Sequence, residues 1–185
     1  EKNNIKAFLG LSVYICPDHY LGTNIDRIIN YGKNDKLDYL IIESAGLCNR
    51  CSPHLNDILA VTVMDMLSGI NTPKKTGPLL KSADIVILTR GDLISQAERE
   101  VFRIQISKMN KKALILEING LTGQNSHLLA AQFENAIVYN PKKDLHLRYT
   151  MPAAVCSFCL GEKRAGEVHA RGNVKLFEIN EKKRK

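Results

Sequence analysis

The feature that most constrains the fold is an alternation of short apolar runs with helical patterns over the first 140 residues. The apolar runs are rich in isoleucine, leucine and valine, and short polar links separate them from the helical segments. This alternation is typical of α/β domains, in which helices join parallel strands. We therefore predict an α/β fold with a mostly parallel sheet and helices on both faces. Strands are predicted at residues 5–15, 39–43, 57–66, 85–88 and 113–118, and helices at residues 20–31, 73–83, 95–109 and 125–133.

Local signals support three of these elements. Residues 85–88 form an unbroken Ile-Val-Ile-Leu run, as expected for a strand that is buried on both faces. Ser95 and Glu98 have the spacing of a capping box, which predicts a helix start at that point. Thr23 or Asn24 is expected to cap the helix predicted at residues 20–31.

The sequence changes character after residue 140, where prolines, a Cys-x-x-Cys pair and many charged residues replace the alternation. We predict one domain over residues 1–140 and an irregular, Cys-containing extension with little core of its own over residues 141–185. Residues 174–179 are expected to add an edge strand. The net charge is +7, and the last four residues are all basic. A solvated tail is the simplest interpretation, with an acidic partner or nucleic acid as alternatives. Nucleic acid is disfavoured because no aromatic residues interleave with these basic ones.

The five cysteines form one singleton, Cys16, and two Cys-x-x-Cys pairs, which is not the pattern of a small secreted disulfide framework. The sequence contains no signal peptide and no apolar run long enough to span a membrane. These observations favour a reducing, cytoplasmic location. The chain begins at Glu1 without an initiator methionine, so we expect it to be part of a longer protein.

Polar residues follow three of the predicted strands, where ligands bind in open α/β sheets. Glu43 ends one strand and can hold Mg²⁺, while Gly46 lets the backbone approach a phosphate. Asp92 lies just after the strand at residues 85–88, where its carboxylate can accept two hydrogen bonds from guanine N1 and N2. A helix-capping role is the alternative for Asp92. The next strand ends in Asn119-Gly120-Leu121, a turn that can pack against a base.

Together these strand ends resemble the nickel-inserting GTPases of hydrogenase and urease maturation, the metallochaperone branch of the P-loop GTPases. The resemblance covers residues 5–133. Asp38-x-x-x-x-Glu43-x-x-Gly46 resembles the magnesium and γ-phosphate loop of the family, which implies a catalytic role for Glu43 and Gly46. Thr89-Arg90-Gly91-Asp92 stands where the family has Asn-Lys-x-Asp, and Asn119-Gly120-Leu121 stands at the last nucleotide loop.

This resemblance implies a P-loop NTPase-like fold, truncated at its amino end, that binds GTP and Mg²⁺. It also implies a homodimer and a client metalloenzyme or accessory protein as partners. The sequence nevertheless contains no Gly-x-x-x-x-Gly-Lys-Ser/Thr motif. We expect that loop upstream of Glu1, and we expect this chain alone to bind nucleotide poorly and to be inactive as a GTPase.

Thiols and imidazoles cluster around the same loops. Cys16 and His19 follow the first predicted strand, where the family has a Cys/His pair, and Cys48, Cys51 and His54 follow Gly46. Such ligands suit Zn²⁺, Ni²⁺, copper(I) or an iron–sulfur cluster. The alternatives are a buried thiol for Cys16 and a surface or capping role for His54. Cys156 and Cys159 would need His169, the first cluster or a dimer partner to complete a metal site.

Two hypotheses follow. The first is a GTP-dependent metallochaperone or metallocofactor-assembly factor in which GTP hydrolysis is coupled to delivery of nickel or another transition metal. The second is a non-catalytic Cys/His scaffold that binds a metal or an iron–sulfur cluster. Glu43, Gly46 and Asp92 favour the first hypothesis, since a scaffold has no need of all three residues.

Overall fold

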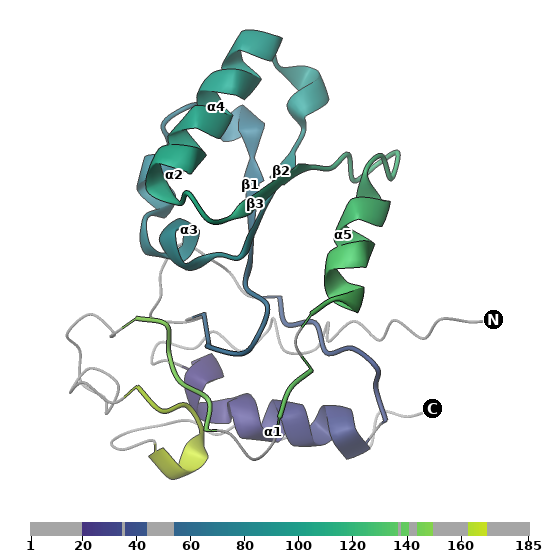
Figure 1. Ribbon diagram of the computed structural model, residues 1–185, viewed down its shortest axis with the longest axis vertical. Helices are drawn as coiled ribbons and strands as arrows, with labels where there is room; N and C mark the ends of the chain where they lie inside the picture. The colour runs from purple at the N-terminus through teal and green to yellow at the C-terminus, as the bar shows by residue number, and fades with distance from the viewer. Residues whose placement is uncertain are drawn as a thin grey trace.

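The computed structural model describes residues 20–34, 36–43, 54–136, 138–140, 144–149 and 163–169. Its centre is a parallel sheet with the order β1-β2-β3. The strands are β1 (Val61–Asp65), β2 (Ile85–Thr89) and β3 (Leu114–Glu117). Figure 1 shows this sheet in the upper part of the molecule, with helices on either side of it. The predicted α/β class with a parallel sheet is therefore confirmed.

Strand β2 lies in the middle of the sheet and pairs with both neighbours. Val61 aligns with Ile85 on one side, and Ile85 aligns with Leu114 on the other. The four residues from Ile85 to Leu88 are all buried. This explains why β2 has an unbroken apolar sequence, because a central parallel strand covered by helices must be apolar on both faces.

Helices cover both faces of the sheet. On one face lie α2 (Thr72–Thr76), α3 (Pro78–Ser82) and α4 (Gln96–Met109), and on the other lies α5 (Ser126–Glu134) (Figure 1). The first face holds the larger apolar core, in which Phe102 and Ile106 of α4 are fully buried. On the second face, Leu129 of α5 packs against a smaller core of Ile85, Ile87 and Leu116.

A separate apolar cluster lies below the sheet, around helix α1 (Tyr20–Asn34). Ile25 and Ile29 of α1 are buried there with Leu55, Leu145, Leu147 and Ala165. In Figure 1 the green and yellow segments of the C-terminal region lie beside α1. Described parts of residues 144–169 thus share a core with α1, while the proposed domain boundary near residue 140 stays a prediction.

The single helix predicted at residues 73–83 is wrong, because the segment forms α2 and α3 instead. Gly77 separates the two helices with a φ of 47°, a conformation that glycine adopts at little cost. Pro78 follows directly, and a proline disfavours helical geometry in the residue before it. The Gly77-Pro78 pair therefore ends one helix and starts the next.

The buried strand predicted at residues 39–43 is also wrong. The described segment 36–43 is irregular, and the side chains of Tyr39 and Ile41 are both 57% exposed. Only Leu40 packs against the α1 cluster. A parallel strand needs a hydrogen-bonded neighbour and cover on both faces, and no described strand pairs with this segment.

The bounds of two other elements differ from the predicted ones by a few residues. The strand predicted at residues 57–66 is limited to β1, because Asp57 lies in a turn with a φ of 59°. The predicted cap of α1 is wrong, since the helix already begins at Tyr20 and Asn24 is buried within it. The strands predicted at residues 5–15 and 174–179 lie outside the described residues.

The capping box of α4 is confirmed. The Ser95 hydroxyl accepts a hydrogen bond from the Glu98 backbone N–H, and the Ser95 backbone N–H donates to the Glu98 carboxylate. We expect Ser95→Ala to lower the free energy of unfolding by about 1 kcal/mol, because it leaves helix N–H groups unsatisfied. Denaturant unfolding measures this change. Ser107→Ala, on the exposed face of the same helix, is the matched control and should cause no loss of stability; an equal loss would contradict the capping role.

Within the described part of the chain, no helix has both the length and the apolar character needed to cross a membrane.

Candidate functional site

The carboxyl ends of the three strands meet at one edge of the sheet. Asp65, the last residue of β1, is aligned with Thr89 at the end of β2, and Leu88 is aligned with Glu117 at the end of β3. Ligands of open α/β sheets bind beyond this edge. The loops that follow β2 and β3, both predicted to bind nucleotide, are therefore neighbours in space.

The loop after β2 holds an exposed carboxylate. Arg90 has a left-handed backbone with a φ of 59°, and Gly91–Leu93 then form a 3₁₀ turn. The Asp92 side chain is exposed on this turn and has no hydrogen bond or ion pair to another described residue. An exposed carboxylate without a protein partner is available to accept hydrogen bonds from a ligand.

Arg90 and Thr89 each have a partner in β1. The Arg90 guanidinium forms an ion pair with the Asp65 carboxylate, and the Thr89 hydroxyl donates to the Met64 carbonyl oxygen at 3.4 Å. Both side chains therefore connect the loop after β2 to β1. Asp65 was not among the residues predicted from sequence, although it stands at the end of an apolar run, the same signal that singled out Glu43.

Gly91 has a packing role in the same loop. A Cβ atom at this position would lie 3.1 Å from the Met66 sulfur and 3.3 Å from Cδ of Arg99. Both distances are shorter than ordinary contacts, so the glycine allows the turn carrying Asp92 to sit close to the end of β1 and the start of α4.

The loop after β3 is a tight turn built on Asn119. The Asn119 side-chain oxygen accepts hydrogen bonds from the backbone N–H groups of Leu121 at 3.0 Å and Thr122 at 3.2 Å. This Asx turn leaves the Leu121 side chain 99% exposed and leaves Gly120 facing open space. An exposed apolar side chain next to the loop that carries Asp92 suits the flat face of a base.

Glu117 fixes the end of β3 against α4. Its carboxylate accepts a hydrogen bond from Arg103 at 2.8 Å and lies 3.8 Å from Arg99. The Glu117 backbone carbonyl accepts from the Asn125 side chain at 2.9 Å. These contacts position the loop after β3, and none of them involves a residue that was predicted to bind the nucleotide.

Of the residues predicted to bind phosphate and magnesium, the structure describes Glu43 alone. Glu43 is exposed at the end of the irregular segment 36–43, which lies between α1 and the sheet in Figure 1. Gly46 lies outside the described residues. The catalytic roles assigned to Glu43 and Gly46 therefore stay predictions.

His54 lies at the opposite end of the sheet. Its Nδ1 is 2.8 Å from the hydroxyl oxygen of Ser82, which stands shortly before the start of β2. Because β2 has five residues, His54 lies about 15 Å from the carboxyl edge. Burial lowers the pKa of His54, and the nearby Arg148 lowers it further. This lowering favours the neutral form of the imidazole, which is the form that binds metals.

An ion pair next to His54 joins three parts of the chain. Arg148 donates to both carboxylate oxygens of Asp84, at 2.7 and 2.6 Å. Its remaining N–H groups donate to the backbone carbonyls of Leu55, Ile58 and Ser82 at 2.7 to 2.9 Å. All five N–H groups of the guanidinium are therefore satisfied. No local pattern in the sequence predicts this contact, since Arg148 lies 64 residues from Asp84.

Asp84 predicts a pH dependence of stability. Desolvation raises its pKa, but the hydrogen bonds from Arg148 and from the Ala60 backbone outweigh this and leave the pKa below its usual 3.8. The unfolded chain therefore binds a proton first, so the stability contributed by Asp84 is present above pH 3.8 and is lost as the pH falls through the folded-state pKa. We expect Asp84→Asn to be less stable than the original chain at neutral pH and to lose less further stability between about pH 5 and 3. Denaturant unfolding at each pH tests this, and parallel pH profiles would contradict it.

The predicted metal ligands other than His54 lie outside the described residues. These are Cys16, His19, Cys48, Cys51, Cys156 and Cys159. Among the residues that the structure describes, no three His, Cys, Asp or Glu side chains are grouped so that they could hold a metal ion. The metal-binding roles of these residues stay predictions.

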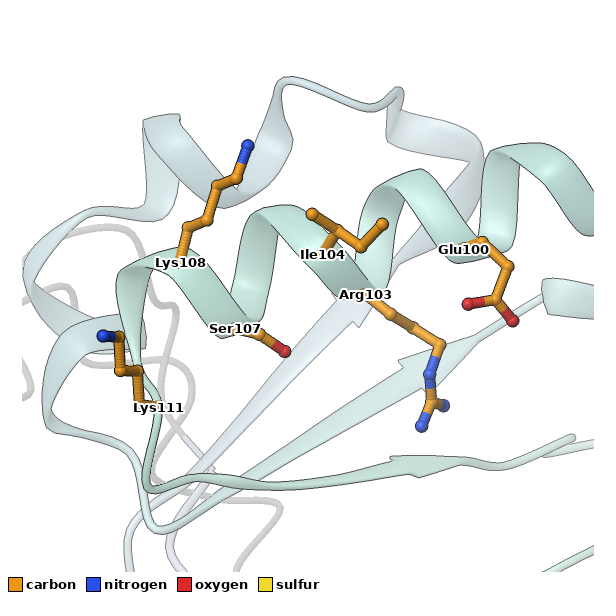
Figure 2. Close-up of a pocket in the computed structure, with 6 residues that line it drawn as sticks. All are labelled: Glu100, Arg103, Ile104, Ser107, Lys108 and Lys111. Carbon is orange, nitrogen blue, oxygen red and sulfur yellow. The ribbon is translucent and has the colours of Figure 1, made fainter.

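A shallow depression of about 580 Å³ lies along α4 (Figure 2). Its lining is mostly charged, with three cations beside one carboxylate, and none of the predicted nucleotide or metal residues contributes to it. The lining residues are Glu100, Arg103, Ile104, Ser107, Lys108 and Lys111.

Comparison with known proteins identifies relatives of the chain. Residues 16–117, more than half of the chain, match the model of the CobW/HypB/UreG nucleotide-binding domain. The uncharacterized protein MJ0120 of Methanocaldococcus jannaschii is 44% identical over 178 residues, which cover 96% of this chain and 76% of the relative. Among solved structures, the hydrogenase maturation factor HypB of Archaeoglobus fulgidus aligns at 17% identity with a TM-score of 0.38, over 42% of this chain and 39% of that one.

Proposed function

This chain belongs to the CobW/HypB/UreG family of nucleotide-binding proteins, and on that basis we propose that it acts as a GTP-dependent metallochaperone or metallocofactor-assembly factor. The cargo is a soft or borderline transition metal, with Ni²⁺ as the first candidate and Zn²⁺ or an iron–sulfur precursor as alternatives. The recipient is a client metalloenzyme or its accessory protein, and the active form is a homodimer.

The observation that carries the nucleotide part of the proposal is the free carboxylate of Asp92. It stands on the loop after β2, at the carboxyl edge, and is exposed without a partner among the described residues. A carboxylate accepts paired hydrogen bonds from guanine N1–H and N2–H, whereas adenine does not offer this pair of donors. The neighbouring Asn119 turn, with its exposed Leu121, supplies a surface for the base.

The phosphate end of the nucleotide is assigned to residues nearer the amino terminus. Glu43 would hold Mg²⁺ through water, and Gly46 would let the backbone approach the γ-phosphate. Bound Mg²⁺ would supply charge neutralisation at the phosphates. No Gly-x-x-x-x-Gly-Lys-Ser/Thr motif occurs within this chain, so we expect the chain alone to bind the phosphates weakly.

The metal part of the proposal rests on the chemistry of the donors. Cys48 and Cys51 follow Gly46 by two and five residues, and Cys16, His19 and His54 are further candidate ligands. Thiolate and imidazole donors suit soft and borderline metals. A change at Gly46 on GTP hydrolysis would therefore reach the metal-binding thiols through only a few residues of backbone, which is the physical basis for coupling nucleotide state to metal release.

Guanine selectivity tests the proposal. We expect the isotope-labelled chain to show saturable NMR shifts at residues 89–92 and 119–121 with GDP, at millimolar concentrations because the chain contains no Gly-x-x-x-x-Gly-Lys-Ser/Thr motif to hold the phosphates. ADP at equal concentration should cause much smaller shifts, because it carries the same phosphates but not the guanine donors. Equal shifts with GDP and ADP, or shifts confined to other residues, would contradict the assignment of this edge.

A further inference from the structure

The C-terminal end of α4 carries lysines without a counter-charge among the described residues. Lys108, Lys111 and Lys112 lie in or just after the last turn of the helix, and all three are exposed. None of their ammonium groups forms a hydrogen bond or ion pair with another residue that the structure describes. The helix dipole accounts for Lys108 in the last turn, but its effect falls off beyond that turn, where Lys111 and Lys112 lie.

Helix α3 brings a fourth exposed lysine to the same end of α4. The side-chain amide of Asn110, which directly follows α4, donates to the backbone carbonyls of Leu80 at 2.9 Å and Ala83 at 2.8 Å. Lys81 lies between these two acceptors in the sequence, and Lys111 directly follows Asn110. The buried Asn110 therefore holds the backbones of the two lysines close together. We call the four lysines the lysine cluster; its members are Lys81, Lys108, Lys111 and Lys112.

The lysine cluster continues into the depression along α4 that Figure 2 shows. Its lining includes Glu100 near the start of the helix, Ile104 in the middle and Lys108 near the end. Steps of four residues place these three side chains on one face of the helix, over about 12 Å. Lys111 lines the same depression just beyond the helix end. The surface therefore presents a carboxylate, then an exposed apolar side chain, and then cations.

This order suits a partner protein better than a nucleic acid. Ile104 is 51% exposed between the charged residues, and an apolar centre within a charged rim is typical of protein–protein interfaces. Phosphate groups would be repelled by Glu100. The one arginine in the lining, Arg103, already donates to the Glu117 carboxylate at 2.8 Å, and the lining contains no aromatic side chain for base stacking.

We propose that the lysine cluster and the adjoining face of α4 bind an acidic segment of a partner protein. This inference rests on the proposed function, which includes a client or accessory protein, and it names the chemistry of that partner's contact. The segment carries carboxylates opposite the lysine cluster, an apolar side chain opposite Ile104 and a cation opposite Glu100. Opposite charges at the two ends fix the orientation of the segment.

The position of this surface separates partner binding from nucleotide binding. Helix α4 begins shortly after the loop that carries Asp92 and has 14 residues, so its far end lies about 21 Å from that loop. Lys81, in contrast, directly precedes Ser82, whose hydroxyl oxygen is 2.8 Å from Nδ1 of His54. A partner bound to the lysine cluster would thus lie near the predicted metal ligand His54 and leave the carboxyl edge accessible to nucleotide.

NMR titration of the isotope-labelled full chain with a synthetic peptide tests this inference. The probe is a peptide of about 15 residues, or four helical turns, with lysine at one end, leucine in the middle and glutamates at the other end. We expect saturable shifts at residues 81 and 100–112, and an affinity that falls as NaCl is raised from about 50 to 300 mM. A peptide of the same composition with its charges evenly mixed should bind more weakly. Absence of shifts at residues 100–112 would overturn the inference.

Charge reversal in the lysine cluster gives the second test. Lys108→Glu/Lys111→Glu should weaken peptide binding at least about 10-fold, because each change replaces an attraction by a repulsion. Lys182→Glu/Lys183→Glu, in the basic run at the end of the sequence, makes the same change in net charge and is the matched control. It should change the affinity less than about 2-fold. Equal losses in the two variants would overturn the inference, since binding would then follow net charge alone.

Other anionic ligands are distinguished by competition. A DNA duplex, or vesicles of phosphatidylserine and phosphatidylcholine, that bind residues 100–112 more tightly than the peptide and displace it would overturn the inference and assign the surface to a nucleic acid or a membrane. The peptide, DNA and vesicle titrations use the unaltered chain, so they do not depend on the folding of a variant. Failure of the proposed function would instead appear as equal shifts with GDP and ADP at the carboxyl edge.

Discussion

Asp92→Asn should reverse the base preference of the protein. The asparagine amide cannot accept from both guanine N1–H and N2–H, so GDP binding should weaken about 100-fold, the loss expected for two hydrogen bonds to a charged acceptor. Xanthine carries an oxygen in place of the guanine N2 amine, and the Asn amide can donate to it. XDP should therefore bind Asp92→Asn better than GDP does, whereas the original chain should prefer GDP.

NMR titration with GDP, XDP and ADP measures this preference in the original chain and in the variant. Glu100→Gln is the matched control, because it removes one exposed carboxylate from the outer face of α4 rather than from the carboxyl edge. It should keep the preference for GDP. If Asp92→Asn binds GDP as the original chain does, Asp92 is a surface cap and does not read the base.

Replacement of Arg148 by lysine should destabilise the fold by about 2–4 kcal/mol. Lysine keeps the charge but offers one ammonium group in place of a five-donor fork. The contacts to the Asp84 carboxylate and to the carbonyls of Leu55, Ile58 and Ser82 cannot all be made by that group. Part-buried acceptors would be left unsatisfied, so the cost exceeds that of an exposed ion pair.

Chemical denaturation measures the free energy of unfolding of Arg148→Lys. Arg27→Lys is the control, because Arg27 pairs with Glu167 at 2.9 Å but both side chains are more than one third exposed. Exposed ion pairs contribute little to stability, so Arg27→Lys should unfold at nearly the same denaturant concentration as the original chain. Equal losses in the two variants would show that the Arg148 contacts contribute no more stability than a surface ion pair.

The elements that were predictable from sequence are those whose signals are local. The apolar run of β2 and the capping box of Ser95 and Glu98 each depend on neighbouring residues, and both are confirmed. The segment at residues 39–43 has the composition of a strand, but strand formation also needs a pairing partner, which composition does not supply. The division of residues 73–83 into two helices was readable from Gly77-Pro78, and that signal was overlooked.

The same distinction between local and long-range signals applies to the candidate site. The proximity of the loops carrying Asp92 and Asn119 was predictable, because the carboxyl ends of adjacent parallel strands meet at one edge. The contacts of Arg148 with Asp84 and the pairing of residues 54–56 with residues 146–148 join segments about 60 to 90 residues apart. Sequence spacing alone could not show that these segments are neighbours in space.

Metal analysis of the anaerobically purified chain tests the central claim most directly. Elemental analysis should find about one nickel, zinc or iron ion per chain, and the Cys48→Ser/Cys51→Ser variant should contain almost no metal. That result would establish the loop after Gly46 as a metal-handling site in a nucleotide-binding protein. Absence of metal from both proteins, even after reconstitution with Ni²⁺ or Zn²⁺, would contradict the metallochaperone account.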